Sequence, residues 1–355
     1  MKFKIGKNTI SNNSKTYFIA DIGANHDGSL SRAKKLIRLC AKAGADAAKF
    51  QHFKASTIVS DYGFKKIGKI GHTRKWKKSV YQIFEEASID NSWTPKLKAE
   101  CKKYKIDFLT APYDLNYVES VNKYIEAFKI GSGDITWHDI IEKISKKRKP
   151  IFLACGASEL EHVEKAIKKI KKVHSKIALM QCNSNYTNSE ENYKHTNLNV
   201  LKTFRKKFGN EIILGLSDHT IGHNSVLGAV ALGARCVEKH FTDNNFRKGP
   251  DHKFAMNPKT WNLMVKETRK LEGSLGNGIK TIQPNEKLSK IVQRRSVRAK
   301  TFLKKGQIIR ERDLTYLRPA PNNSFLPFEK SKVIGKKLKK DLKKHENIFK
   351  KYLKN

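Results

Sequence analysis

The sequence predicts a (β/α)₈ barrel followed by a small, separate C-terminal domain. Three observations support this fold class. Eight short apolar or β-branched runs alternate with amphipathic, lysine-rich stretches of helical spacing over about 270 residues. Polar or charged residues follow nearly every run, as expected where barrel strands end at a catalytic face. The alternation then stops near residue 275. A doubly wound parallel sheet is the alternative that the alternation alone leaves open.

The expected elements follow from the spacing of their apolar residues. The strand candidates are 17–22 (YFIADI), 45–50 (ADAAKF), 106–111 (IDFLTA), 126–131 (EAFKIG), 150–155 (PIFLAC), 176–182 (KIALMQC), 211–216 (EIILGL) and 234–241 (ARCVEKHF). The helix candidates between and after them are 30–43, 77–87 with 94–105, 117–123, 138–147, 159–172, 197–208, 223–233 and 258–273. Residues 52–76, after the second strand, are expected to form a long loop on the catalytic face.

The chain changes character after the last helix candidate. Residues 1–275 form the expected catalytic barrel domain, and the polar stretch 276–287 (GNGIKTIQPNEK) is expected to be a linker. Residues 288–355 contain short strand and turn patterns without long helical periodicity. We therefore expect them to form a second domain.

The composition excludes several classes of protein. The chain has 355 residues, with 73 Lys plus Arg against 33 Asp plus Glu, and a formal net charge of +40. Because 38% of the residues are hydrophobic, a disordered polycation is excluded. No run approaches ~18 uninterrupted apolar residues, and the N-terminal segment lacks a secretory hydrophobic stretch. We expect no membrane span and a cytoplasmic location.

The kind and distribution of the basic residues and the cysteines disfavour a nucleic-acid-binding protein, a disulfide framework and a zinc cluster. A pI near 10.0 is typical of nucleic-acid binding, but 59 of the 73 basic residues are lysines, spread along the whole chain. Recognition surfaces concentrate Arg and aromatic residues, so we do not expect nucleic acid as a partner. The charge would attract anionic substrates instead. The five cysteines are scattered and odd in number, which disfavours a disulfide framework or a zinc cluster.

Two histidines follow neighbouring strand candidates. His219 lies in SDHT after the seventh strand, and His240 lies in EKHF at the end of the eighth. On a barrel they could share a divalent metal such as Mn²⁺, with open positions for Lewis-acid chemistry on a carbonyl. Glu238 and Asp218 could orient the two imidazoles. From these residues alone, a purely structural role for the histidines stays open.

Two lysines end other strands. Lys49 and Lys129, with the hydroxyls of Thr110, Ser132 and Ser217, could surround a phosphate and a carboxylate. A lysine inside a barrel is costly unless an anion pairs with it, which favours a ligand. A metal-free Schiff-base aldolase is the rival interpretation, because it also uses a strand-end lysine.

Two carboxylates lie near the expected metal. Asp21 ends the first strand in IADIGANHDG, and Asp251 lies with His252 on a Gly-Pro loop beyond His240. Ordinary turn chemistry could explain both. Their closeness to His240 favours a functional role.

At these residues the chain resembles the sialic acid synthase family, the phosphoenolpyruvate-dependent synthases of nine-carbon acids. The resemblance covers essentially the whole chain and implies a (β/α)₈ barrel followed by a domain similar to type III antifreeze protein (the SAF domain). It also implies a domain-swapped homodimer whose small domain caps the partner's active site. The motifs that carry it are IADIGANHDG, AAKFQ (47–51), FLTAPYD (108–114), FKIGSGDI (128–135), ACGAS (154–158), LMQCNSNYT (179–187), GLSDHTIGH (215–223), EKHFT (238–242), GPDHKFAMNP (249–258), RRSVRA (294–299) and LRPAP (317–321).

The resemblance implies roles for individual residues. The metal, typically Mn²⁺ with Mg²⁺ or Co²⁺ as alternatives, would be bound by His219 and His240. Phosphoenolpyruvate would be held by Lys49, Thr110, Lys129, Ser132, Ser184 and Ser217. The sugar would be bound by Gln51, Asp134, Tyr186, Asp251 and Arg318. The catalytic groups would be Asp21, which could move a proton, with Lys129 and Glu238.

Three positions depart from the family pattern. Asp21 stands where a glutamate is usual, Ala154 where some members carry a phosphate-binding serine, and Ser184 where an asparagine is usual. We therefore expect the groups around the phosphate to differ in detail.

The activity that the resemblance implies is that of an N-acetylneuraminate synthase. Such an enzyme condenses phosphoenolpyruvate with an open-chain N-acyl mannosamine, with metal assistance, to give a nine-carbon 2-keto acid and phosphate. Legionaminate synthase, pseudaminate synthase and a synthase for a 6-phosphorylated sugar are the alternatives within the family. A non-catalytic, nucleic-acid-binding barrel is the alternative from a different class. It predicts the loss of catalytic side chains that this sequence retains.

Overall fold

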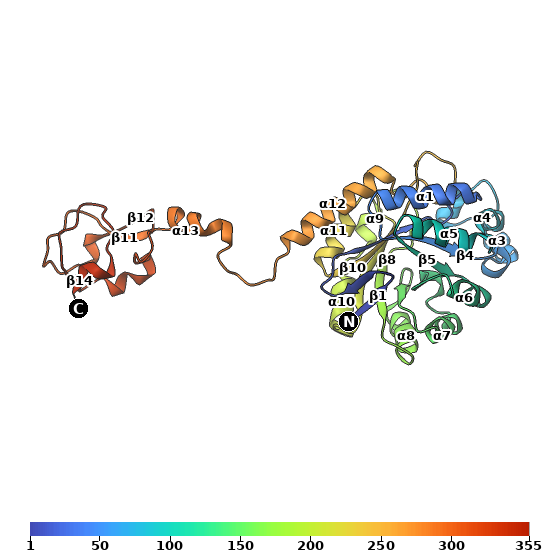
Figure 1. Cartoon of the computed structure of the whole chain (residues 1–355), viewed down its shortest axis with the longest axis horizontal. Coiled ribbons are helices and arrows are strands. Elements are labelled where there is room, and N and C mark those ends of the chain that lie inside the picture. Colours follow the sequence, from blue (N-terminus) through green and yellow to red (C-terminus); the bar gives the residue numbers. More distant parts are fainter. Residues whose placement is uncertain (355) are drawn as a thin grey trace. The chain divides into compact units, whose positions relative to one another are not determined.

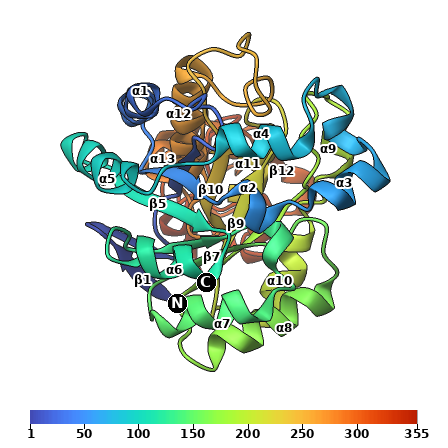
Figure 2. The ribbon, with the colours of Figure 1, turned by 90° about the vertical axis from the view of Figure 1, so that its right-hand side faces the viewer.

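The structure contains the expected eight-stranded barrel. The computed structural model describes residues 1–354, apart from the side chains of His72 and Lys75. Eight parallel strands close in the order β10-β3-β4-β5-β6-β7-β8-β9, and helices surround them (Figures 1 and 2). This confirms the predicted (β/α)₈ class. The strands are β3 (Tyr17–Asp21), β4 (Ala47–His52), β5 (Asp107–Pro112), β6 (Phe128–Ile130), β7 (Ile151–Ala154), β8 (Ile177–Cys182), β9 (Ile213–Asp218) and β10 (Ala234–His240).

The outer helices form because each presents one apolar stripe to the strands. In α7 (His138–Lys146) the stripe is Ile140, Ile141 and Ile144, all buried. The other helices of this layer are α1 (Leu30–Lys42), α5 (Trp93–Lys103), α6 (Leu115–Asn122), α8 (Leu160–Lys171), α10 (Val200–Phe208), α11 (Asn224–Ala231) and α12 (Pro258–Ser274). A further helix, α4 (Val80–Ala87), lies between β4 and α5 and buries only Val80. The boundaries of these helices lie within a few residues of the expected ones.

An N-terminal hairpin closes one end of the barrel. The strands β1 (Lys2–Ile5) and β2 (Asn8–Ser11) pair antiparallel, and the sequence prediction did not include them. Phe3 packs edge-on against Phe152 with ring centroids 6.3 Å apart, in one buried cluster with Ile5 and Ile10. Because this cluster fills the amino end of the barrel, the carboxyl end is left for a binding site.

The prediction of a long loop at 52–76 was wrong. This segment contains α2 (Ala55–Ile58), α3 (Asp61–Ile67) and the 3₁₀ helix η1 (Gly71–Lys75). The Ser60 side chain caps α3 by accepting a hydrogen bond from the Gly63 amide, a start signal that the sequence reading overlooked. A further short helix, α9 (Asn192–His195), precedes α10.

The C-terminal residues form a second compact unit. The division falls between Gly276 and Asn277, next to the expected barrel boundary at 275. The second unit contains η3 (Pro284–Glu286), α13 (Lys287–Gln293), β11 (Ser296–Ala299), η4 (Glu311–Asp313), β12 (Leu314–Leu317), η5 (Pro327–Lys332), β13 (Lys337–Leu338), η6 (Lys350–Tyr352) and β14 (Leu353–Lys354). It has its own buried cluster, which includes Val297, Val333 and Leu342. No described helix has the length and apolar character that a bilayer crossing requires.

Candidate active site

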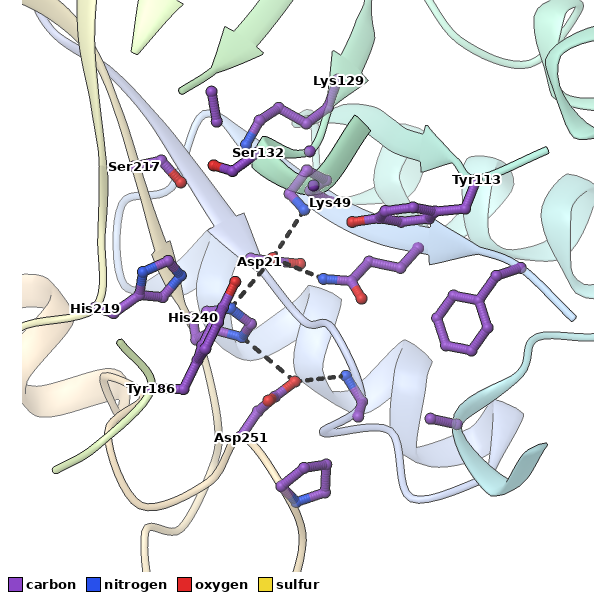
Figure 3. A pocket seen from close by; sticks show the side chains of 18 of the residues that line it. Asp21, Lys49, Tyr113, Lys129, Ser132, Tyr186, Ser217, His219, His240 and Asp251 are labelled. Carbon is purple, nitrogen blue, oxygen red and sulfur yellow. Dashed lines mark hydrogen bonds and ion pairs between the residues drawn. The ribbon is translucent and has the colours of Figure 1, made fainter. Parts of the chain in front are cut away.

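A pocket opens at the carboxyl ends of the barrel strands (Figure 3). One part of its lining is polar and holds most of the predicted site residues, and the other part is mainly aliphatic and aromatic. The polar part consists of Asp21, Lys49, Gln51, Lys129, Ser132, Cys182, Tyr186, Ser217, His219, Glu238, His240 and Asp251. The second part includes Ala24, Phe53, Ile58, Trp76, Ile83, Phe84, Ala87, Tyr113, Ala154 and Pro250.

Strand register explains why residues distant in sequence meet here. Across three neighbouring strands, His240 pairs with Asp21 and Asp21 pairs with Lys49. On the next strand of the ring, Ser217 pairs with Glu238. Since paired residues of parallel strands lie at one level, their side chains reach the pocket together.

Two lysines and two carboxylates form a buried ion-pair cluster on the pocket floor. Lys49 Nζ lies 2.8 Å from Asp21 Oδ2 and 3.7 Å from Glu238 Oε1. Lys129 Nζ donates to the same Glu238 oxygen at 2.7 Å. The Ser217 hydroxyl also donates to it, at 3.2 Å. These charges are nearly removed from water, so each depends on the others for stabilisation.

The cluster keeps Asp21 and Lys49 charged. Burial raises the pKa of Asp21, but the Lys49 ammonium outweighs this with help from His240 and lowers that pKa from 3.8 to about 2. Burial lowers the pKa of Lys49, and the carboxylates of Asp21 and Glu238 outweigh it, so the pKa of Lys49 is raised. Both groups are therefore ionised at neutral pH.

Two buried polar atoms in this region have no hydrogen-bond partner. They are Glu238 Oε2 and His240 Nδ1, and the second of these has the Asp251 carboxylate at the longer distance of 3.5 Å. A buried polar atom without a partner is costly, and such atoms at a pocket are commonly satisfied by a ligand or water. Both atoms belong to residues that line the pocket, which supports a polar ligand there.

The two predicted metal histidines lie side by side. Their ring centroids are 5.4 Å apart, and the Tyr186 ring lies 4.3 Å from that of His219 (Figure 3). His219 Nδ1 donates to the Asn183 carbonyl at 2.8 Å, which leaves Nε2 as its ligating nitrogen. Burial lowers the pKa of His240, whereas the neighbouring Cys182 outweighs burial and raises the pKa of His219.

The two histidines could supply only some of the ligands that a divalent metal needs. Among the described residues, no group of three or more His, Cys, Asp and Glu side chains could hold an ion. Two imidazoles are present, so water or substrate oxygens would have to supply the remaining positions. Such an open site is typical of catalytic rather than structural metals.

Asp251 and Asp21 flank His240 on its two sides. His240 Nε2 lies 3.5 Å from Asp21 Oδ2, and Nδ1 lies 3.5 Å from Asp251 Oδ2. The Ala24 amide donates to Asp251 at 3.1 Å. The loop that carries Asp251 is fixed to the loop after β3, because His252 Nε2 and Asp27 Oδ1 lie 2.8 Å apart.

Four predicted site residues do not line the pocket. Thr110 points away from it: its hydroxyl donates to Phe50 O and hydrogen-bonds His52, because alternation along β5 turns Thr110 outward. Asp134 and Ser184 lie beside pocket-lining residues rather than among them. Arg318 belongs to the second compact unit.

Two features of the site were missed from the sequence. Tyr113 lines the pocket directly after β5, and a side chain at Gly131 would collide with its hydroxyl. Phe53, Trp76 and Phe84 form much of one wall. Phe53 and Trp76 occur in a segment expected to be a loop and Phe84 in a helix candidate, so nothing in their spacing marked them as pocket residues.

The fold and this pocket define the chain as a (β/α)₈-barrel enzyme with a lysine–carboxylate site. The chain belongs to the NeuB family: the family model matches residues 36–280, and the SAF domain model matches residues 294–353. The chain is thus a synthase of the sialic acid synthase class.

Relatives and solved structures agree with this membership. The chain is 35% identical to an N,N'-diacetyllegionaminic acid synthase from Campylobacter jejuni, over 94% of this chain and 99% of the relative. It is 28% identical to the human N-acetylneuraminate-9-phosphate synthase, over 96% and 93%. The structure of the N-acetylneuraminic acid synthetase from Leptospira borgpetersenii superposes with a TM-score of 0.71 at 28% identity, covering 81% of this chain and 95% of that chain.

Proposed function

We propose that the enzyme condenses phosphoenolpyruvate with the open-chain form of an N-acyl amino sugar of the mannosamine type, giving a nine-carbon 2-keto acid and phosphate. The observation that carries this proposal is the pocket floor. Two buried lysines there share carboxylates beside two neighbouring histidines. The names of the relatives, which are synthases of such acids, support the product class.

Phosphoenolpyruvate would bind on this floor. Lys49 and Lys129 would turn from their carboxylate partners to the phosphate and carboxylate of the substrate. Ser132 and Ser217 can donate hydrogen bonds to the phosphate, and Gly156 N, which donates to Ser132 Oγ at 2.9 Å, fixes that serine. Charge-assisted bonds of this kind are the strong ones in buried sites.

A divalent metal, Mn²⁺ or alternatively Mg²⁺ or Co²⁺, would be held by His219 Nε2 and His240. When bound, it would act as a Lewis acid toward the sugar aldehyde. Asp251, which lies beside His240 Nδ1, would orient that imidazole and leave Nε2 for the metal.

The reaction balances with one proton carried by Asp21. The π electrons of the phosphoenolpyruvate C2–C3 bond form the new bond from C3 to the aldehyde carbon. Water adds at C2, and its proton passes to Asp21, whose low pKa keeps it deprotonated beforehand. The C2–O bond to the phosphate then breaks as the hydroxyl left at C2 becomes the ketone, and the proton of that hydroxyl leaves with the phosphate. The proton on Asp21 finally neutralises the sugar oxygen.

Further parts of the proposal concern assembly and sugar binding. Gln51, Tyr186 and Asp251 line the pocket and would bind the sugar. Arg318 would reach the sugar from the second domain of a partner chain, in a domain-swapped homodimer. Asp134 and Ser184 would act from the edge of the pocket.

The experiment is phosphate release from phosphoenolpyruvate with Mn²⁺ and a panel of N-acylated sugars. Release that requires both a sugar and the metal supports the synthase, and silence with every sugar from folded, metal-loaded protein refutes it. A Schiff-base aldolase would resist chelation and be trapped by borohydride with pyruvate. The ion pair of Lys49 disfavours that rival at this residue, because the nearby carboxylates outweigh burial and raise the pKa of Lys49, and a protonated amine is not nucleophilic.

A further inference from the structure

The pocket has an apolar wall that the proposed chemistry does not use. Phe53 follows β4, Ile58 ends α2, and Ile83 and Phe84 lie on α4, so one segment of the chain, residues 53–87, builds most of it. Trp76 belongs to the same segment. The wall is therefore a single structural unit, added to the barrel between β4 and α5.

Aromatic packing gives this wall a defined shape. The rings of Phe53 and Phe84 are 5.4 Å apart, and those of Phe53 and Tyr113 are 6.0 Å apart at an interplanar angle of 79°. Phe53 is buried, whereas Ile58 and Phe84 keep part of their surface open. An apolar group of a ligand could cover that surface with a gain of hydrophobic free energy.

The wall lies across the barrel from the histidines. Tyr113 follows β5, and His219 follows β9, which is four places from β5 in the closed ring of eight strands. Figure 3 shows Tyr113 and His219 on opposite sides of the pocket. A sugar whose aldehyde lies at the histidines would therefore extend its far end, at C6, toward the wall.

Among its described side chains, the wall offers no cationic group to a phosphate. Among the lining side chains that the structure describes, the only ammonium or guanidinium groups are those of Lys49 and Lys129. Both are already paired with floor carboxylates. A dianion placed against Ile58 and Phe84 would lose its hydration without gaining a counter-charge, which is strongly unfavourable.

We propose that this wall selects an acceptor sugar that is unphosphorylated and deoxygenated at C6, with its methyl group against Ile58, Ile83 and Phe84. This inference rests on the proposed function and narrows its substrate class. It assigns Phe84 and Ile58 as specificity-determining residues of the site.

Three sugars that differ only at C6 test the proposal: N-acetylmannosamine, its 6-deoxy analogue and its 6-phosphate. With the full-length, Mn²⁺-loaded protein we expect kcat/KM for phosphate release to be about tenfold higher for the 6-deoxy sugar than for the 6-hydroxyl sugar, because one hydroxyl in an apolar pocket has an effect of this order. We expect the 6-phosphate to be at least about 100-fold poorer than the 6-hydroxyl sugar, because a buried charge without a partner costs more than a hydroxyl.

The outcomes separate this inference from the proposed function. Equal rates for the three sugars, or a preference for the 6-phosphate, would overturn the inference while leaving the synthase intact. Release from none of them or from any other N-acylated sugar would overturn the proposed function and the inference with it.

A charge introduced into the wall provides a second test. Ile58→Lys should raise kcat/KM for the 6-phosphate relative to the 6-deoxy sugar at least about tenfold, since a charge-assisted contact contributes that much. Ser56→Lys is the matched control, because Ser56 is exposed on the same short helix and does not line the pocket. A ratio that changes equally in both variants would show general charge attraction and would contradict the wall as the selecting surface.

Discussion

Asp21→Asn is the most informative single substitution, because it removes one charge of the buried cluster while preserving its size. The Asp21 and Lys49 side chains are 3% and 2% exposed, and their ionised atoms are 2.8 Å apart. Breaking a buried pair typically costs about 3–5 kcal/mol of unfolding free energy. Lys49 keeps Glu238 Oε1 at 3.7 Å, so we expect a loss of about 2–3 kcal/mol. We also expect turnover to fall at least about 100-fold, because the proton acceptor is lost.

Urea unfolding at pH 7 and phosphate release measure the two effects. The double variant Asp21→Asn/Lys49→Met should regain at least about half of the lost stability, because no unpaired charge is then buried. Glu191→Gln is the control, since its ion pair with Lys194 is exposed, and it should change stability by less than about 0.5 kcal/mol. A loss below about 1 kcal/mol with turnover within about threefold of the parent would refute the reasoning.

Three further predictions concern the metal, a buried acid and a loop anchor. EDTA should abolish phosphate release and Mn²⁺ should restore it, and His240→Ala should weaken Mn²⁺ binding in calorimetry at least about tenfold. Burial raises the pKa of Asp134 from 3.8 to about 6, so its ionisation should lower stability by about 1–2 kcal/mol as the pH rises from about 4 to 6, and Asp134→Asn should remove this slope in urea titrations. Asp243→Asn should cost about 1–2 kcal/mol at pH 7, because Arg32 and Lys35 bind that carboxylate.

Each of these has an outcome that would contradict it. Undiminished Mn²⁺ affinity in His240→Ala would remove this residue as a ligand. A slope between pH 4 and 6 that persists in Asp134→Asn would belong to another group. For Asp243, although burial raises its pKa, Arg32 and Lys35 lower it overall. Its contribution should therefore be full above the ordinary aspartate pKa and lost as the pH falls through the lowered one, so a constant difference down to acidic pH would be inconsistent with an ionic role.

The barrel could be predicted because its strands are buried on both faces. Runs such as IALMQC in β8 are buried throughout, and such continuous apolar runs alternating with amphipathic helices are typical of parallel α/β folds. The N-terminal hairpin could not be predicted in the same way. Its strands have only four residues each, and their stability comes from packing against Phe152 rather than from local pattern.

The polar half of the pocket could be predicted from the sequence for a geometric reason. The last residues of parallel strands all face the same end of a barrel, so Lys49, Ser217 and His240 had to meet whatever the helices did. Thr110 shows where this reasoning fails. A strand end places a residue at the correct height, but its side chain points inward only at alternate positions, and Ala111 rather than Thr110 is the register partner of Gln51.

The apolar half of the pocket could not be predicted, because each of its residues fits two explanations in the sequence equally well: it could belong to the hydrophobic core or to a pocket wall. Phe53 and Phe84 are separated by about thirty residues of helix and turn, and each alone is indistinguishable from a core residue. Only the folded segment shows that Phe84 keeps an open face toward a cavity whose opposite side holds the histidines. The chemistry of this enzyme was therefore encoded in residues fixed by barrel geometry, whereas its choice of sugar depends on an added segment that must be seen folded to be interpreted.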